Sequence, residues 1–263
     1  MYDQTILDHY ANVAREEGSL ESCTMADEKI RKTETDFILF GIDHYSKLGG
    51  KNNFKVLDIG CGNGYTLETV HAAFPNLHLS GVEFTPELRA LANKKKIPVE
   101  VSSGDIRDRK TIPSGQDVII CQRVLINLLN EDDQKHALAN IAESLVDGGI
   151  LIIIEAFESG LKNLNKCRTE LGLEEIPPAH HNLYLKDSFF DSTDSLAPLE
   201  IGQPSNILST HYFVTRVLHD IALVATSSEF VRNSLFVSFF SEALPQGIGD
   251  FSPLRCHVLK KNG

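Results

Sequence analysis

The chain has 263 residues, of which 42% are hydrophobic, enough for one large domain with a substantial core. Asp and Glu number 36 against 25 Lys and Arg, so the formal net charge is −11. This balance disfavours a nucleic-acid or anionic-membrane partner, because phosphate contacts need clustered basic side chains. Five scattered cysteines without a C-x-x-C pair argue against a disulfide framework or a metal site. With no apolar membrane span and no secretory signal in the sequence, we expect a cytoplasmic protein.

The first part of the chain reads as a helical leader followed by alternating strands and helices. Residues 1–52 form the leader, in which apolar residues from Asp27 to Leu48 recur near one face at helical spacing. Residues 53–156 begin with the apolar strand Phe54–Ile59 and end with the strand Ile150–Glu155. Uninterrupted apolar strands between helices are typical of a parallel sheet that is covered on both faces.

The rest of the chain breaks this rhythm. Residues 157–204 are polar and turn-rich, and we interpret them mainly as an insertion that caps the active face. Residues 205–263 contain a predicted helix at Ser209–Ala225 and a short terminal strand, and we expect them to complete the sheet. The sequence therefore predicts an α/β fold with a doubly wound, mostly parallel sheet, a helical leader and a cap after the fifth strand.

A glycine-rich turn follows the first strand of the predicted core. Residues 56–64 read VLDIGCGNG, in which a strand runs into G-x-G-x-G and then into the start of a helix. Glycines let the backbone approach a ligand closely, and a helix start offers free N–H groups. Tyr65 and Thr66 stand where a dinucleotide-binding fingerprint would place its third glycine. The turn therefore indicates a nucleotide-type ligand but departs from the dinucleotide pattern.

Two carboxylates restrict the ligand further. Asp58 stands two residues before the first glycine, where it would repel a pyrophosphate and attract an ammonium or sulfonium group. Glu83 ends the second strand, and a carboxylate there can accept hydrogen bonds from both hydroxyls of a ribose. A ligand with a ribose and a cation but no pyrophosphate fits S-adenosylmethionine.

On these residues, the segment from about 54 to 156 resembles the class I S-adenosylmethionine-dependent methyltransferases. The resemblance rests on VLDIGCGNG, on GVEF with Glu83, on Gly104-Asp105-Ile106 and on the strand DVIICQRVL. It implies the Rossmann-like fold of that family with a seven-stranded sheet, and a small metabolite as the methyl acceptor. A sugar-linked or surface-polysaccharide precursor is a further expectation from the resemblance, with transfer to oxygen or to nitrogen left open.

The resemblance also implies roles for individual residues. The expected cofactor-binding residues lie at or just after the ends of successive strands: Asp58, Gly60, Cys61, Gly62, Glu83, Asp105, Ile106 and Gln122. Asp58 would orient the amino group of the methionine moiety, and Glu83 would hold the ribose. Asp105 would accept a hydrogen bond from the adenine amino group while Ile106 packs against the ring. Gln122 would line the methionine tail and the mouth for the acceptor.

Candidates for the chemical step should lie beyond the strand ends or in residues 157–204, where ligands bind in α/β sheets. We expect His181 to act as a base for an oxygen acceptor, because histidine titrates near neutral pH. Tyr184 is grouped with it in the stretch HHNLY. Glu155, at the end of the fifth strand, would bind an acceptor amine or hydroxyl, or else pair with Arg123 on the neighbouring strand.

Two other functions stay open from the sequence alone. A nicotinamide-dependent oxidoreductase would share the strand, turn and helix as well as the ribose carboxylate, although Asp58 and the missing third glycine count against it. A methyltransferase-like module would bind the cofactor or a partner without turnover. The oligomeric state is open too, because the helical leader and residues 157–204 would cap either their own active site or that of a neighbour in a homodimer.

Overall fold

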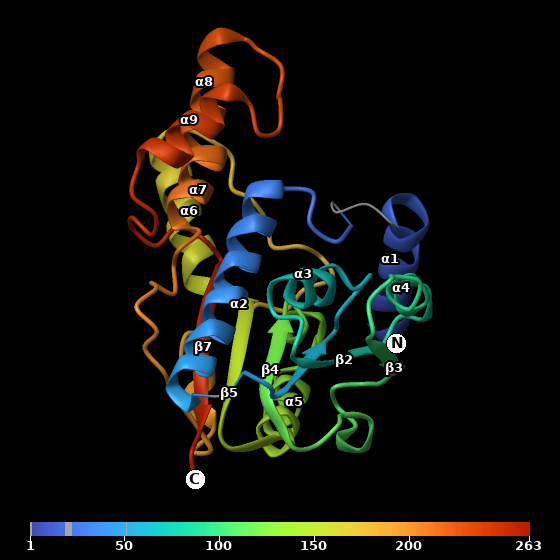
Figure 1. The fold of residues 1–263 in the computed structure, drawn as a ribbon. Helices are drawn as coiled ribbons and strands as arrows, with labels where there is room; N and C mark the ends of the chain where they lie inside the picture. Colours follow the sequence, from blue (N-terminus) through green and yellow to red (C-terminus); the bar gives the residue numbers. More distant parts are fainter. Residues whose placement is uncertain (1, 19–22, 51) are drawn as a thin grey trace.

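A seven-stranded sheet forms the centre of the computed structural model, which describes residues 2–18, 23–50 and 52–263. Its strands are β1 (Lys55–Ile59), β2 (His78–Glu83), β3 (Glu100–Ser103), β4 (Gln116–Gln122), β5 (Leu145–Ala156), β6 (Leu196–Pro198) and β7 (Leu254–Lys261). The order across the sheet is β3-β2-β1-β4-β5-β7-β6 (Figure 1). Neighbouring strands pair in parallel except β7, which runs antiparallel to β5 and to β6. The prediction of a mostly parallel, seven-stranded sheet is confirmed.

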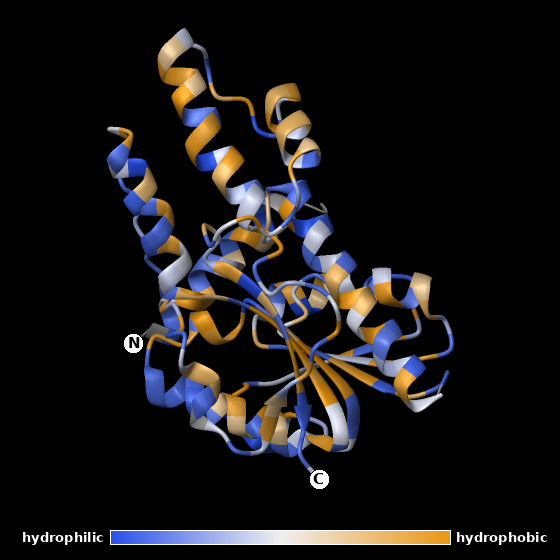
Figure 2. Cartoon of the chain, turned by 90° about the vertical axis from the view of Figure 1, so that its left-hand side faces the viewer, coloured by the Kyte–Doolittle hydropathy of each residue, from blue (hydrophilic) through white to orange (hydrophobic). Residues whose placement is uncertain are grey.

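Helices cover both faces of the sheet, with α2 and α5 on opposite sides (Figures 1 and 2). The α-helices are α1 (Tyr2–Glu17), α2 (Glu28–Gly49), α3 (Tyr65–Ala73), α4 (Pro86–Ala92), α5 (Glu131–Ser144), α6 (Glu158–Glu170), α7 (Ser209–Phe213), α8 (His219–Thr226) and α9 (Leu235–Ala243). Short 3-10 helices lie at Arg109–Thr111, Leu125–Asn127 and Phe189–Ser192, and a π-helical turn at Val214–Leu218 joins α7 to α8. Figure 2 shows the apolar strands between these helices, which is the arrangement that buries both faces of a parallel sheet.

Helix α2 begins and ends where its sequence provides caps. The Asp27 side chain accepts hydrogen bonds from the backbone N–H groups of Lys29 and Ile30, and Gly50 closes the helix in the left-handed conformation with φ of 58°. Its apolar face, which includes Ile38 and Ile42 at 0% exposure, packs on the sheet. The side chains of α2 therefore have fixed positions relative to the ends of the strands.

The segment expected to be a cap, residues 157–204, is divided between two places. Its β6 joins the edge of the sheet beside β7, so part of the segment belongs to the sheet and not to a cap. The stretch near His181 does lie against the strand ends, because the Leu183 N–H donates to the Ile126 carbonyl and the Leu185 N–H to the Ala156 carbonyl, both at 2.8 Å.

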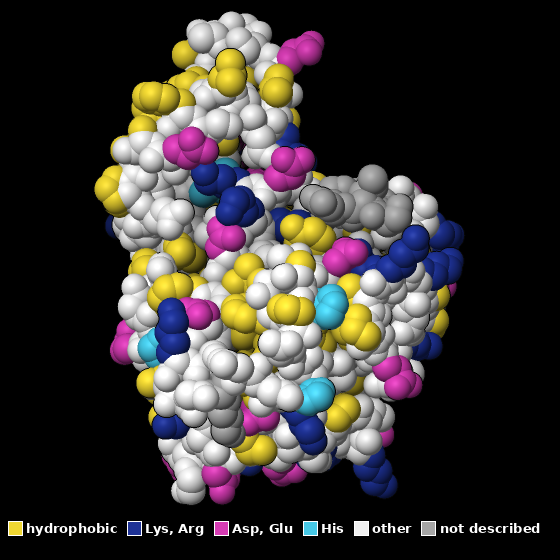
Figure 3. Space-filling view, viewed as in Figure 1, with side chains coloured by type: hydrophobic (Ala, Val, Ile, Leu, Met, Phe, Trp, Pro, Cys, Tyr) yellow, Lys and Arg dark blue, Asp and Glu magenta, His cyan; other side chains and the backbone are white. Residues whose placement is uncertain are grey.

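Helices α8 and α9 project from the body of the molecule as a hairpin (Figure 1). Figure 2 colours much of this projection as hydrophobic, and Figure 3 shows apolar side chains on its surface. The large ones that it exposes are Val224, Phe230, Val231, Leu235 and Phe239. Among the described helices, none combines the length and the apolar character that crossing a membrane requires.

Candidate active site

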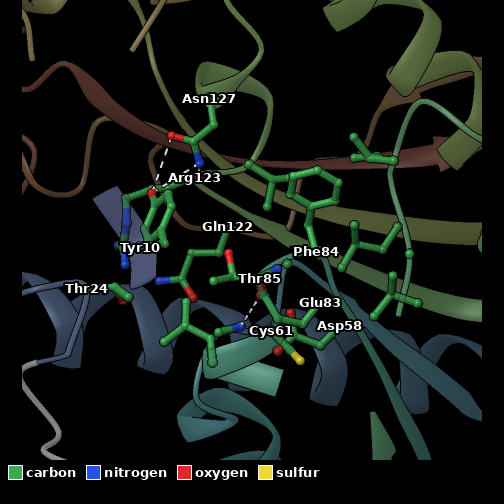
Figure 4. A pocket seen from close by; sticks show the side chains of 18 of the residues that line it. Tyr10, Thr24, Asp58, Cys61, Glu83, Phe84, Thr85, Gln122, Arg123 and Asn127 are labelled. Atoms are coloured by element: carbon green, nitrogen blue, oxygen red, sulfur yellow. Dashed lines mark hydrogen bonds between the residues drawn. The ribbon is translucent and has the colours of Figure 1, made fainter. Parts of the chain in front are cut away.

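A cavity opens at the carboxyl ends of β1, β2 and β4, and it encloses about 1080 Å³ including its open mouth. Residues from the strand ends line its floor, and α1 together with the start of α2 lines the side above them. Figure 4 shows Asp58, Glu83 and Cys61 together at one end and Tyr10, Arg123 and Asn127 at the other. All eight residues expected to bind the cofactor line this cavity, so the structure brings that predicted set together.

The glycine-rich turn forms the floor with two glycines that serve different purposes. Gly60 and Gly62 both adopt the left-handed conformation, with φ of 68° and 56°. A Cβ at Gly60 would lie 2.4 Å from the Val124 side chain, whereas a Cβ at Gly62 would meet nothing within 4 Å. Gly60 therefore allows close packing against the segment after β4, and Gly62 leaves open space above the turn. The Cys61 thiol is buried and burial raises its pKa, which fits packing and not nucleophilic attack.

Asp58 and Glu83 place two buried carboxylates beside the open space. Glu83 accepts hydrogen bonds from the Gly62 N–H at 2.8 Å and from the Thr85 N–H at 2.7 Å, so it also holds the turn in shape. Asp58 is 2% exposed, and no described residue donates a hydrogen bond to its carboxylate. Burial, and then the charge of Glu83, raises the pKa of Asp58 well above its usual range. Two such groups stabilise a cation, which is the chemistry expected for the amino and sulfonium groups of the cofactor.

Asp105 lies at the next strand end and is held by Arg107. The Arg107 guanidinium donates to both Asp105 oxygens, the shortest contact being 2.5 Å, and also to Asp3 of α1 at 2.9 Å. Burial raises the pKa of Asp105, but the hydrogen bonds from the Arg107 side chain and backbone outweigh this effect and lower it overall. Ile106 is 6% exposed and forms the apolar wall beside this group.

The other end of the cavity is basic. Glu34 of α2 is fully buried and accepts hydrogen bonds from Gln122 at 2.8 Å and from the Arg123 guanidinium. The Arg31 guanidinium lies over the Tyr65 ring, 4.8 Å from its centroid. Burial, and then the charge of Arg123, lowers the pKa of Arg31, which reflects how close these two cations are. The basic end therefore carries two arginines and one buried carboxylate.

A second cavity adjoins the first and shares Tyr10, Thr24 and Arg123 with it. Its described lining is completed by His9, Val13, Met25, Ala26, Ile126, His181 and Asn182. The His181 ring stacks on His9 with centroids 3.9 Å apart. Burial, with His9 and His180 nearby, lowers the pKa of His181 to about 4. His181 is thus placed beside the first cavity, as expected, but as a neutral ring.

Two of the expected catalytic residues lie elsewhere. Glu155 lines neither cavity and is 0% exposed, because its carboxylate accepts hydrogen bonds from the N–H groups of Val124 and Leu125, both at 2.8 Å, and of Ile126. It holds the segment after β4 and does not contact an acceptor, and the alternative pairing with Arg123 is also wrong, since Arg123 pairs with Glu34. Tyr184 packs half-buried against the core outside the described lining of both cavities.

The residues predicted from the sequence did not include Tyr10, Arg31 and Glu34. Arg31 and Glu34 carried a usable signal, because they are charged residues inside the apolar stripe of the predicted helix, where a buried charge needs a partner. Tyr10 carried none, since its place over the cavity depends on how α1 returns to the strand ends.

Comparisons with known proteins agree with this fold. A family model described as a methyltransferase domain matches residues 56–149. Malonyl-[acyl-carrier protein] O-methyltransferase of Bacillus cereus is 26% identical over 141 residues, which cover 51% of this chain and 51% of that protein. The chain thus spans about half the length of the curated relatives it matches.

Two solved structures share the fold of the chain. The plantazolicin methyltransferase BpumL, solved with S-adenosylhomocysteine, superposes with a TM-score of 0.55 at 16% identity and covers 99% of this chain and 92% of its own. The N-methyltransferase NodS from Bradyrhizobium japonicum, also solved with S-adenosylhomocysteine, gives a TM-score of 0.50 at 18% identity, covering 73% and 87%.

The fold and the family match define a class I S-adenosylmethionine-dependent methyltransferase domain. The matched methyltransferase domain, residues 56–149, forms the centre of the Rossmann-like sheet. The antiparallel β7 between β5 and β6 departs from the dinucleotide-binding order 3-2-1-4-5-6, and this counts against the oxidoreductase alternative.

Proposed function

We propose that the chain transfers a methyl group from S-adenosylmethionine to oxygen or nitrogen of a small metabolite. The observation that carries the proposal is the buried Asp58 carboxylate, which faces the cavity beside Gly62 without a hydrogen bond from a described residue. A buried carboxylate of this kind is costly unless a cation joins it. The ammonium group of the cofactor provides that cation.

The residues around the cavity fit the rest of the cofactor. Glu83 accepts hydrogen bonds from the Gly62 N–H of the turn and from the Thr85 N–H, and its remaining lone pairs would accept from the hydroxyls of a ribose. Asp105 and Ile106 would hold the adenine, and Arg31 at the basic end would bind the methionine carboxylate. When bound, the cofactor supplies a methyl group on a sulfonium, for which the protein must provide alignment more than activation.

The second cavity is the place for the acceptor, because it meets the first at Tyr10, Thr24 and Arg123. For a hydroxyl acceptor, His181 is the proposed base. The names of two curated relatives specify methylation at oxygen, which favours oxygen over nitrogen here. A sugar-linked or surface-polysaccharide precursor stays a prediction from the family resemblance.

Calorimetric titration with S-adenosylmethionine, S-adenosylhomocysteine and NADH in parallel tests the cofactor. We expect micromolar binding of the first two and no binding of NADH, and binding of NADH alone would overturn the proposal. Slow conversion of S-adenosylmethionine to S-adenosylhomocysteine by the purified protein separates an enzyme from a module that only binds. The homodimer stays a prediction, and sedimentation velocity tests it directly.

A further inference from the structure

Arg123 stands at the wall between the two cavities in a backbone conformation that its side chain does not favour. Its φ is 55°, in the left-handed region, and its N–H donates to the Ile154 carbonyl at 2.8 Å. A glycine would adopt this conformation at lower cost. Strained backbone of this kind persists where the side chain has a task that justifies it. The task of Arg123 is not explained by cofactor binding, for which Arg31 is available.

The guanidinium of Arg123 is held in place from one side. Glu34 accepts from it and also from Gln122, so the buried carboxylate fixes the direction of both side chains. The Asn127 amide donates to the Arg123 carbonyl at 2.9 Å, which steadies the backbone. Of the Arg123 side chain 15% stays exposed, and that part faces the cavities. Because Arg31 lies close by, the two arginines and Glu34 leave one net positive charge at this wall.

The second cavity has the lining that an anion with an apolar body needs. Arg123 is the charged residue among those described there, and none of them is acidic. Val13, Met25, Ala26 and Ile126 form an apolar surface next to it. An ammonium group would meet no described counter-ion in this cavity, whereas a carboxylate would meet a guanidinium that matches its geometry.

We propose that the acceptor is a carboxylic acid with an apolar body, that Arg123 binds its ionised carboxylate, and that the product is a methyl ester. The inference rests on the proposed function and names the acceptor class for the same site. One carboxylate oxygen forms a bond to the methyl carbon while the carbon–sulfur bond breaks and its electron pair stays on sulfur. No proton is transferred, so the site needs no general base.

Two matched sets of compounds test the acceptor class, each with one body and three reacting groups. The first set is octanoate, octylamine and octanol, and the second is phenylacetate, phenethylamine and phenethyl alcohol. Each compound is incubated with the protein and S-adenosylmethionine, and products are identified by mass spectrometry before and after mild alkali. We expect an alkali-labile methyl ester from an acid and no product from its amine or alcohol. Independently of turnover, calorimetry should show the acid binding to protein saturated with S-adenosylhomocysteine.

Variants at position 123 test the binding residue. Arg123→Gln should raise KM for the acid by about 10- to 100-fold, as expected for a lost charged hydrogen bond, and change kcat less. Its Kd for S-adenosylhomocysteine should stay within about threefold of the wild-type value, since Arg31 is kept. Arg232→Gln on the exposed hairpin is the matched control and should leave both values unchanged.

A second variant protects the test against misfolding. Arg123→Gln leaves Glu34 buried without its cation, which is a known route to instability. The double variant Glu34→Gln with Arg123→Gln removes both charges and should fold, bind S-adenosylhomocysteine and still bind the acid poorly.

The outcomes separate the two proposals. Failure to bind S-adenosylhomocysteine would overturn the proposed function and this inference with it. Binding of S-adenosylhomocysteine together with methylation of an amine or an alcohol in place of its acid would overturn the inference alone. So would an Arg123→Gln protein whose KM for the acid equals that of the wild type.

Discussion

The Arg107 guanidinium donates to the Asp3 carboxylate at 2.9 Å, and this ion pair ties α1 to the loop after β3. Asp3, Ile6 and Tyr10 of α1 all line the first cavity, where we propose that the cofactor binds, so α1 covers it. The Asp3 side chain is 45% exposed, and partly exposed ion pairs contribute only about 0.2–1 kcal/mol. A contact of this strength holds a cover that can still open for exchange of a ligand.

Asp3→Asn should therefore make ligand exchange faster without changing the fold. We expect the dissociation rate of S-adenosylhomocysteine to rise by about two- to fivefold, which corresponds to loss of a partly exposed ion pair. Stopped-flow displacement measures this rate. Asp8→Asn, at an exposed position of the same helix without an ion pair to the core, is the control. Equal rates for both variants would show that the contact with Arg107 does not restrain α1.

Asp58→Asn should weaken the binding of S-adenosylmethionine and raise the stability of the ligand-free protein. Loss of the charge should weaken binding of S-adenosylmethionine by about 10- to 100-fold, the range for a charged hydrogen bond. The ligand-free protein should become more stable, because a buried carboxylate whose pKa is raised by burial and by Glu83 destabilises the fold. Calorimetry and urea unfolding measure the two effects, with the exposed Asp147→Asn as control. A variant that loses stability but keeps its affinity would make Asp58 a structural residue.

The two glycines of the turn should respond differently to alanine. Gly62→Ala should cost about 1–2 kcal/mol of unfolding free energy from the left-handed backbone alone, and it should weaken ligand binding because its Cβ enters the open space. Gly60→Ala should cost about 1–3 kcal/mol more, since its Cβ would overlap the Val124 side chain. Adding Val124→Ala should restore stability to Gly60→Ala but not to Gly62→Ala. Urea unfolding of the wild type, the two glycine variants and their two combinations with Val124→Ala measures these differences. Equal rescue of both glycine variants would show that contact with Val124 is not what requires glycine at position 60.

His181 separates the two views of the acceptor. A base for a hydroxyl acceptor would make His181→Ala lose about 10²–10⁴-fold in turnover. Burial and the neighbouring histidines lower the pKa of His181 to about 4, so the ring is already neutral near pH 7 and a carboxylate acceptor needs no base. With an acid as acceptor we therefore expect less than about a tenfold loss and an unchanged pH–rate profile above the pKa of the acid. His78→Ala, exposed at the opposite end of β2, is the control. A large loss of turnover confined to His181→Ala would show that His181 acts as a general base.

The meeting of Asp58 and Glu83 at one end of the first cavity could be predicted because its information is local. Strand, turn and helix are contiguous in VLDIGCGNG, and Asp58 and Glu83 stand at strand ends that must meet at one edge of a parallel sheet. The acceptor end could not, because Tyr10 and Arg31 come from helices that precede the core, and no local pattern places them beside Arg123. Glu155 shows a further limit. Its position at a strand end was read correctly, but the backbone N–H groups that surround it come from a segment about 30 residues away.

The raised pKa of Glu155 predicts a pH dependence of the free energy of unfolding. Burial raises the pKa of Glu155 from 4.5 to about 7, although backbone N–H groups from Leu125 and Val124 oppose the shift. Between these two values the folded state binds more protons than the unfolded state, so the free energy of unfolding falls as pH rises through this window. The fall amounts to about 3 kcal/mol.

Glu155→Gln should remove this part of the pH dependence, because an amide does not titrate, while its carbonyl still accepts from Val124 and Leu125. Urea unfolding at pH values of about 5 and 8, on either side of the window, measures the difference between variant and wild type. Glu158→Gln changes an exposed carboxylate three residues away and should keep the wild-type dependence. If Glu155→Gln instead loses stability equally at both pH values, the carboxylate is ionised in the folded state throughout this range. Its hydrogen bonds to the segment after β4 would then outweigh the effect of burial.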